Sequence, residues 1–102
     1  MGLWKRIDEF AEPPAGRGTC VEVDGVRLAV FDINGALCAL AGTCPHRGGP
    51  LGEGMLEGQV VACPWHGWEF DVTTGANVHA PEISVRRYPL ETRPDGVWAE
   101  LE

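Results

Sequence analysis

Residues 44–67 read CPHRGGPLGEGMLEGQVVACPWHG. The stretch holds two of the four cysteines and two of the three histidines of the chain, arranged as Cys44-x-His46 and Cys63-x-x-His66. A proline follows each cysteine and glycines are frequent, which is typical of tight loops rather than of a helix. Two loops that each present one thiol and one imidazole can converge on one inorganic centre. The pattern therefore predicts a metal site built from two loops.

Short alternating segments separated by turn signals fill the rest of the chain. Three turn dipeptides, each typical of a β-hairpin, separate these segments: Asp24-Gly25, Asn34-Gly35 and Asp95-Gly96. Runs at 58–63 and 68–72, on either side of the second Cys/His loop, are also expected to be strands. No window of about a dozen residues has helical periodicity, and 14 glycines and 8 prolines interrupt most candidates. We expect an all-β fold.

Length and composition limit what the chain can be. Its 102 residues suffice for one domain with a modest core, but not for a separate catalytic domain. No apolar run approaches the roughly 18 residues of a membrane span, and the N-terminus lacks the apolar stretch of a secretory signal. We therefore expect a cytoplasmic protein without membrane contact.

The chain is acidic, with a formal net charge of -7 and a pI near 4.8. Such a surface is repelled by a phosphate backbone, so nucleic acid is not an expected partner. A partner with a basic patch is favoured, although acidity that serves only solubility remains an alternative.

The two motifs resemble a known family. Cys44-Pro45-His46 together with Cys63-Pro64-Trp65-His66-Gly67 closely resembles the two-loop signature of Rieske 2Fe-2S proteins, and of their small ferredoxins in particular. Segments 30–51 and 63–75 are also similar to the running pattern of that family. The resemblance implies a single Rieske domain over 1–102. It has an antiparallel, β-sandwich-like base and a cluster-binding subdomain at about 42–75.

The resemblance also implies a ligand set for one Rieske-type 2Fe-2S cluster. Cys44 and Cys63 would bind one iron as thiolates, while His46 and His66 would bind the other through imidazole nitrogens. Two thiolates neutralise the formal charge of the oxidised core, whereas four would leave it doubly negative. A cluster with these ligands is therefore expected to be easier to reduce than a cluster bound by four cysteines.

Two other interpretations of the four side chains remain. A structural zinc site also uses two cysteines and two histidines, but zinc knuckles usually place both cysteines of a pair on one turn. The other interpretation is four reduced side chains without metal, although soft ligands rarely gather in glycine loops without a role. Colour separates the zinc site from the cluster, because a zinc protein is colourless and a Rieske protein is brown.

No catalytic residue is predicted in this chain. A Rieske oxygenase also needs a mononuclear iron held by two histidines and a carboxylate, and only His79 remains once two histidines are used. No Gly-x-Gly-x-x-Gly unit is present for a nicotinamide or flavin. The resemblance implies a monomeric one-electron carrier between an NAD(P)H-dependent flavin reductase and a ring-hydroxylating oxygenase. The alternative is the Rieske-like small subunit of an NADH-dependent assimilatory nitrite reductase.

Several other residues lie outside the motifs. Cys20 and Cys38 are expected to be buried in strands as small apolar side chains, without a disulfide between them. His79 precedes Pro81 and is either an ordinary surface histidine or part of a proline-containing third loop that shields the cluster in the family. Trp4 and Trp98 are expected to pack in the core or on a hairpin.

Aromatic residues around the second loop bear on the reduction potential. Trp65, Trp68 and Phe70 are expected to keep water away from the site. In the high-potential respiratory branch of the family, cysteines replace Gly49 and Trp65, and a serine and a tyrosine replace Trp68 and Phe70. Because this chain lacks those sulfur and hydroxyl groups, we expect a potential at the low end of the Rieske range.

Overall fold

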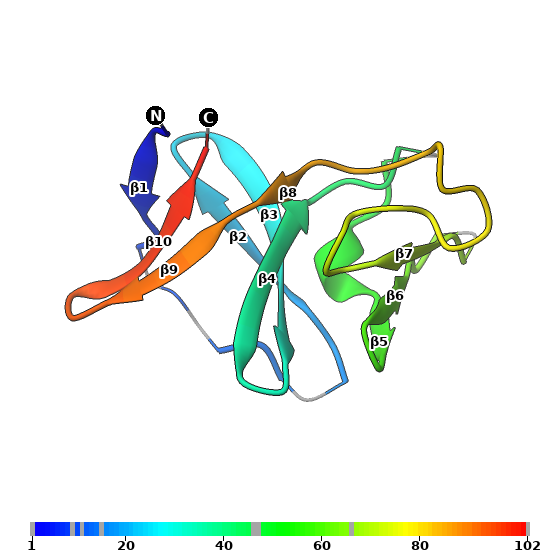
Figure 1. Ribbon diagram of the computed structural model, residues 1–102, viewed down its shortest axis with the longest axis horizontal. Coiled ribbons are helices and arrows are strands. Elements are labelled where there is room, and N and C mark those ends of the chain that lie inside the picture. The colour runs from blue at the N-terminus through cyan, green and yellow to red at the C-terminus, as the bar shows by residue number, and fades with distance from the viewer. Residues whose placement is uncertain are drawn as a thin grey trace.

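The computed structural model describes residues 2–8, 10, 12–14, 16–45, 48–65 and 67–101. Within them the chain forms three antiparallel sheets and one short 3-10 helix, which confirms the all-β fold (Figure 1). The helix, η1, spans Leu51–Glu53, so no helix in this part of the chain could cross a membrane. The strands are β1 Trp4–Arg6, β2 Thr19–Val23, β3 Val26–Ile33, β4 Ala36–Ala41, β5 Met55–Glu57, β6 Val60–Ala62, β7 Glu69–Asp71, β8 Arg87–Tyr88, β9 Leu90–Arg93 and β10 Gly96–Glu100.

The hairpin turns form as the sequence predicts. Asp24 and Gly25, between β2 and β3, have φ of 52° and 81°, and Asn34 and Gly35, between β3 and β4, have φ of 54° and 91°. Positive φ at both central positions defines the primed turn that matches the right-handed twist of paired strands. The middle sheet therefore has the order β2-β3-β4-β8 and is built mainly from two consecutive hairpins.

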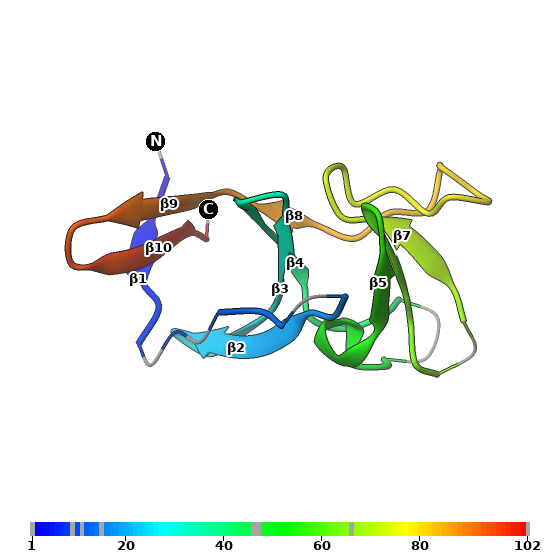
Figure 2. The same cartoon turned by 90° about the horizontal axis from the view of Figure 1, so that it is seen from below.

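This middle sheet separates two hydrophobic cores (Figure 2). Leu28 and Val30 of β3 belong to the core shared with the sheet β1-β10-β9, whereas Ala29 and Phe31 belong to the core shared with β5-β6-β7. Side chains of a strand alternate between its two faces, so consecutive residues of β3 enter different cores. All four are fully buried, and β3 reads as a continuous apolar run for that reason.

The third sheet, β5-β6-β7, lies between β4 and β8 in the chain, and one Cys/His loop precedes it while the other lies within it. The first loop leads from β4 into η1, and the second connects β6 to β7. Leu51 of η1 is fully buried beneath these loops, in the core cluster that includes both loop cysteines. The predicted subdomain bounds of 42–75 stay a prediction.

The two ends of the chain meet in the first sheet, where β1 pairs with β10 (Figure 1). The Arg93 guanidinium lies 5.3 Å from the Trp4 ring centroid and 4.6 Å from that of Trp98. The two tryptophans therefore pack on the β9–β10 hairpin through an arginine between them, which confirms their predicted packing role.

Candidate metal centre

The first loop is a tight turn that begins at Cys44. The carbonyl oxygen of Cys44 accepts a hydrogen bond from the Gly48 N–H at 2.7 Å, and the Cys44 N–H donates to the Gly49 oxygen at 2.8 Å. Both bonds close the backbone around the residues that follow the cysteine. These hydrogen bonds therefore fix Cys44 at the start of a compact loop.

The second loop repeats the same hydrogen bonds at Cys63. Its carbonyl oxygen accepts from the Gly67 N–H at 3.1 Å, and its N–H donates to the Trp68 oxygen at 2.7 Å. In both loops the bonds join the cysteine to the residues four and five positions later. Cys44 and Cys63 therefore occupy equivalent places in two loops of the same backbone design.

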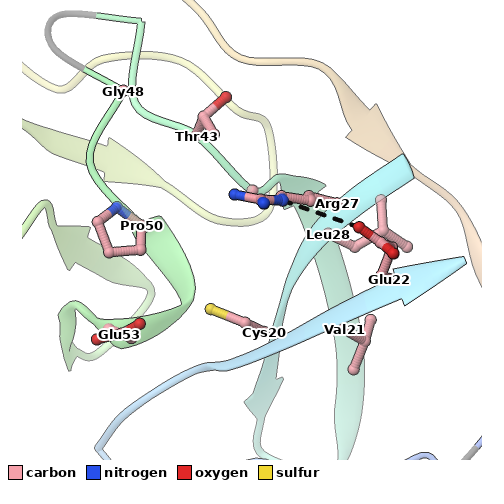
Figure 3. A pocket seen from close by; sticks show the side chains of 10 residues that line it. Cys20, Val21, Glu22, Arg27, Leu28, Thr43, Gly48, Pro50 and Glu53 are labelled. Atoms are coloured by element: carbon pink, nitrogen blue, oxygen red, sulfur yellow. Dashed lines mark ion pairs between the residues drawn. The ribbon is translucent and has the colours of Figure 1, made fainter. Parts of the chain in front are cut away.

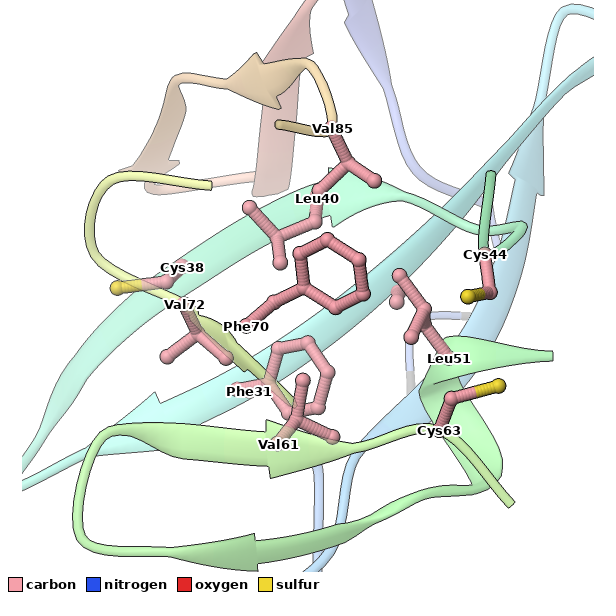
Figure 4. Packing of buried hydrophobic residues seen from close by; sticks show 11 residues of the cluster. Phe31, Cys38, Leu40, Cys44, Leu51, Val61, Cys63, Phe70, Val72 and Val85 are labelled. Atoms are coloured by element: carbon pink, nitrogen blue, oxygen red, sulfur yellow. The ribbon is translucent and has the colours of Figure 1, made fainter. Parts of the chain in front are cut away.

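The two cysteine side chains meet beneath these loops. Cys44 is 2% exposed and Cys63 3%, and a hydrogen bond joins their thiols. They lie together at one end of the core beside Leu51, whereas Cys38 lies at the other end (Figure 4). Neither forms a disulfide. Two buried thiols in contact are suitable ligands for one soft metal ion.

The electrostatics of Cys63 reflect this burial. Burial raises the pKa of the Cys63 thiol, a hydrogen bond from the Trp65 backbone N–H opposes the increase, and the Cys44 thiol adds to it. Without metal, burial therefore favours the protonated state of Cys63, and its thiolate forms when a cation compensates for the charge. The N–H of Trp65 is directed at the Cys63 sulfur, where it would stabilise thiolate charge.

Close packing between the loops depends on Gly49. A Cβ at this position would lie 2.6 Å from Cys63 Sγ and 3.1 Å from the Trp65 Cβ. No real side chain tolerates the first distance, so glycine lets the first loop approach the sulfur of the second. The structure thus brings together Gly49 and Trp65, which sequence reasoning related only through the family.

His46 and His66 lie outside the described residues. By sequence each follows its cysteine within its loop, before Gly48 and Gly67 respectively. The complete set of four site residues, Cys44, His46, Cys63 and His66, therefore remains a prediction. The described half of that set fits a 2Fe-2S cluster, because two adjacent buried thiols sit on matched loops.

The aromatic residues near the second loop differ in burial. Phe70 is fully buried in the same core cluster as the two cysteines, and Trp68 packs partly buried against it. Trp65 is 51% exposed. Phe70 and Trp68 therefore cover the inner side of the site as expected, while the Trp65 indole extends into solvent.

Cys20 contradicts its predicted burial. It is exposed and lines a hollow of about 260 Å³ behind the first loop, with Thr43 and Pro50 on the opposite wall (Figure 3). β2 is an edge strand, and Cys20, opposite Ala29 on the face toward the third sheet, lies beside Gly52 of η1 at the margin of that core. The apolar neighbours in sequence therefore misled the prediction. Cys38 is buried, as expected.

Comparison with known proteins gives the family. A profile described as Rieske [2Fe-2S] domain matches residues 3–89. The ferredoxin component of a naphthalene 1,2-dioxygenase system from Pseudomonas aeruginosa is 34% identical over 95% of this chain and 96% of its own length. A solved complex of reduced oxygenase and oxidised ferredoxin in carbazole 1,9a-dioxygenase contains a chain with 30% identity and a TM-score of 0.81, covering 100% of this chain and 96% of that one.

A third relative shares the fold. The small subunit of an NADH-dependent nitrite reductase from Mycobacterium tuberculosis superposes with a TM-score of 0.77 over 97% of this chain and 95% of its own, at 24% identity. The full-length match of ferredoxin components, the profile and the paired cysteine loops agree with one another. This chain belongs to the Rieske [2Fe-2S] family and is an electron carrier with a Rieske-type 2Fe-2S cluster.

Proposed function

We propose that this protein passes single electrons from an NAD(P)H-dependent flavin reductase to a ring-hydroxylating oxygenase. The observation that supports it best is the pair of equivalent loops with two buried cysteines in contact, in a chain that aligns end to end with a dioxygenase ferredoxin component. We further propose that the carrier acts as a cytoplasmic monomer.

In this proposal four side chains hold the cluster. Cys44 and Cys63 bind one iron as thiolates, and His46 and His66 bind the other through ring nitrogens. When bound, the cluster takes up and releases one electron. The remaining tasks belong to the protein: the buried cysteine side excludes water, and the Trp65 N–H donates to the Cys63 sulfur.

The open side of the site suits brief contact with other proteins. Pro64 and Trp65 are exposed on the second loop, and Val78, 46% exposed, follows in the next segment. Exposed apolar groups beside a buried centre allow a partner to approach without rearrangement of the core. We assign no catalytic step to this chain.

The small subunit of a nitrite reductase is the second candidate. Its support is the shared fold, and a fold shared at 24% identity does not indicate a shared activity. The relative of 34% identity over nearly the whole chain favours the shuttle. In the second candidate the chain would remain within an enzyme complex.

The experiment uses the reductase and the terminal enzyme encoded beside this gene. The purified brown protein should be reduced by NADH through the flavin reductase and reoxidised by the oxygenase during aromatic hydroxylation. The matched control is Cys63→Ala, which should support neither step. Neighbouring genes for a sirohaem nitrite reductase, with reoxidation only by that enzyme, would contradict the proposed pathway and leave the electron carrier intact.

A further inference from the structure

The turn between β3 and β4 consists of Asn34 and Gly35. Both residues are exposed, and their φ values are 54° and 91°. A Cβ added at Gly35 would meet nothing within 4 Å, so no neighbouring group covers this residue. Glycine also has no side chain to hinder attack of its own nitrogen on the residue before it. The turn therefore leaves the side-chain amide of Asn34 beside an unhindered backbone nitrogen.

The Asn34 side chain is not held in place. Among the residues that the structure describes, none forms a hydrogen bond with it. The side chain borders a hollow of about 350 Å³ that is also lined by Gly58 and Gln59, which lie at the turn between β5 and β6. Asn34 therefore has room to turn its amide carbon toward the backbone of Gly35.

Asn77, the other asparagine of the chain, is in the opposite situation. It is 5% exposed, and its side-chain oxygen accepts hydrogen bonds from the N–H groups of His79 at 2.8 Å and Ala80 at 3.0 Å. The nitrogen that follows it, that of Val78, donates to the Glu69 oxygen at 2.9 Å. Both groups that would have to react are fixed, so Asn77 is an internal reference for Asn34.

One contact at the turn opposes a reaction of Asn34. The Gly35 N–H donates a hydrogen bond to Asp32 Oδ1 at 2.7 Å. The nitrogen must leave this bond and lose its proton before it can attack Asn34 Cγ. A carboxylate beside the nitrogen disfavours negative charge there, so it opposes loss of the proton. Because the bond is exposed and breaks readily, Asp32 slows the attack without preventing it.

We propose that Asn34 is a site of spontaneous modification, where the side chain converts to aspartate and isoaspartate at a rate that Asp32 limits. The Gly35 nitrogen bonds to Asn34 Cγ, its proton and the side-chain NH₂ group leave as ammonia, and a five-membered imide forms. Water then breaks either of the two C–N bonds of the imide ring, which yields aspartate or isoaspartate. No electrons are transferred, and water is the only co-reactant.

The isoaspartate form alters the hairpin. Its main chain runs through the former side chain and is one atom longer, between two residues that pair directly across the turn, Ile33 and Ala36. A two-residue primed turn has a fixed backbone geometry that a longer chain does not fit. Conversion also adds a negative charge beside Asp32. Modified copies of the protein therefore differ from new ones at this end of the middle sheet, which marks their age.

The test follows both asparagines in the purified holoprotein during several weeks in warm, neutral buffer. Trypsin separates them, because Asn34 lies in peptide 28–47 and Asn77 in peptide 48–86. Mass spectrometry measures conversion of amide to acid, and a protein-isoaspartyl methyltransferase with labelled S-adenosylmethionine measures isoaspartate.

Three variants test the role of the carboxylate. Asp32→Ala removes the acceptor, and Asp32→Ser keeps an uncharged one. Glu22→Gln is the matched control, because it removes one negative charge near the opposite end of β3. Visible absorption and circular dichroism before incubation establish that each variant is folded.

In the wild type, Asn34 should convert while Asn77 stays intact over the same period. Asp32→Ala should convert about 2- to 13-fold faster, the range that corresponds to one lost hydrogen bond of 0.5–1.5 kcal/mol. Asp32→Ser should lie between these two rates, and Glu22→Gln should match the wild type. Conversion of Asn34 no faster than that of Asn77 would overturn the site. Rates in the two Asp32 variants at or below the wild-type rate would overturn the role of Asp32.

Discussion

Cys44 and Cys63 combine three properties, and neither of the other two cysteines has all of them. They are almost completely buried, they contact each other, and each begins a tight loop. Cys38 shares only the burial and lies at the far end of the core (Figure 4). Cys20 shares none of these properties.

Removing a predicted ligand should abolish the cluster. In Cys63→Ala or His46→Ala, no described cysteine lies where it could replace the lost ligand, so iron binding and visible absorption should both be lost. Iron and acid-labile sulfide analysis of the purified variants measures the loss. Full retention of iron and sulfide would contradict the ligand assignment.

Cys20→Ala and Cys38→Ala are the matched controls for this experiment. Both should keep full iron and sulfide content, because neither side chain borders the thiol pair. Cys38→Ala should also lower the stability by about 1 kcal/mol, since it removes one buried sulfur from the core. Loss of the cluster in either control would mean that the wrong cysteines had been chosen.

Two apolar side chains determine the expected potential. Trp68 and Phe70 stand where the high-potential branch of the family has hydroxyl donors, so the midpoint at pH 7 should lie nearer to about -150 mV than to about +300 mV. Phe70→Tyr should raise it if the new hydroxyl donates to a ligand sulfur, because Phe70 packs in the same core cluster as both cysteines. Protein-film voltammetry measures both. A wild-type midpoint above about +100 mV would rule out the low-potential assignment.

At the scale of elements, the two loops work as a unit because they pack without a side chain between them. Gly49→Ala would place a Cβ within 2.6 Å of Cys63 Sγ, so one loop must move. We expect this variant to fold but to bind clearly less iron than the wild type, as measured by the ratio of visible to protein absorbance.

Gly48→Ala is the neighbouring control. An added Cβ at Gly48 meets nothing within 4 Å, but its φ of +73° disfavours alanine by about 1 kcal/mol. This variant should lose stability and keep its iron. The opposite result, iron lost in Gly48→Ala and kept in Gly49→Ala, would show that backbone conformation rather than loop contact governs assembly.

The elements with strong local signals could be predicted from sequence. β2, β3 and β4 combine alternating or continuous apolar runs with Asp-Gly or Asn-Gly turns, and all three form as expected. β1, β5, β8 and β9 were not identified. Each has only two to four residues, too few for a clear local pattern. β1 and β8 also depend on partner strands that are distant in sequence, β10 and β4.

The candidate site, like the fold, could be predicted only in part from the sequence. Spacing alone indicated two loops with one cysteine each, because a cysteine and a histidine so close together in a glycine-rich stretch are typical of a tight loop. Features that depend on tertiary packing were not predictable: the fit of Gly49 against Cys63, the exposure of Cys20, and the burial of the hydrogen-bonded Asn77. An asparagine in a loop has many uses, and only the fold shows that this one is buried.

At the scale of the whole molecule, charge is unevenly distributed along the chain. Segment 42–84, which contains both loops, holds one basic residue, Arg47, and five acidic ones: Glu53, Glu57, Glu69, Asp71 and Glu82. Acidic groups around an electron-transfer centre favour a basic partner surface. The net charge of -7 also favours a basic partner surface.

Electron transfer to the partners should therefore slow as salt rises from about 20 to 300 mM, because the screening length falls through this range. Stopped-flow kinetics with the reductase or the oxygenase measure the effect. Reoxidation by a small uncharged acceptor is the control and should not depend on salt. A flat profile with the protein partners would show that apolar contacts, such as those of Trp65, bring them together instead.

The most direct test of the central claim is pulsed EPR of the reduced protein, grown with either natural or 15N-labelled histidine. Two histidine ligands give strong nitrogen couplings to the unpaired electron, and both should change with the label. The same couplings in His79→Gln should be unaltered, since His79 is not a ligand. A reduced cluster whose spectrum is indifferent to histidine labelling would be ligated by cysteine alone, and would contradict the account.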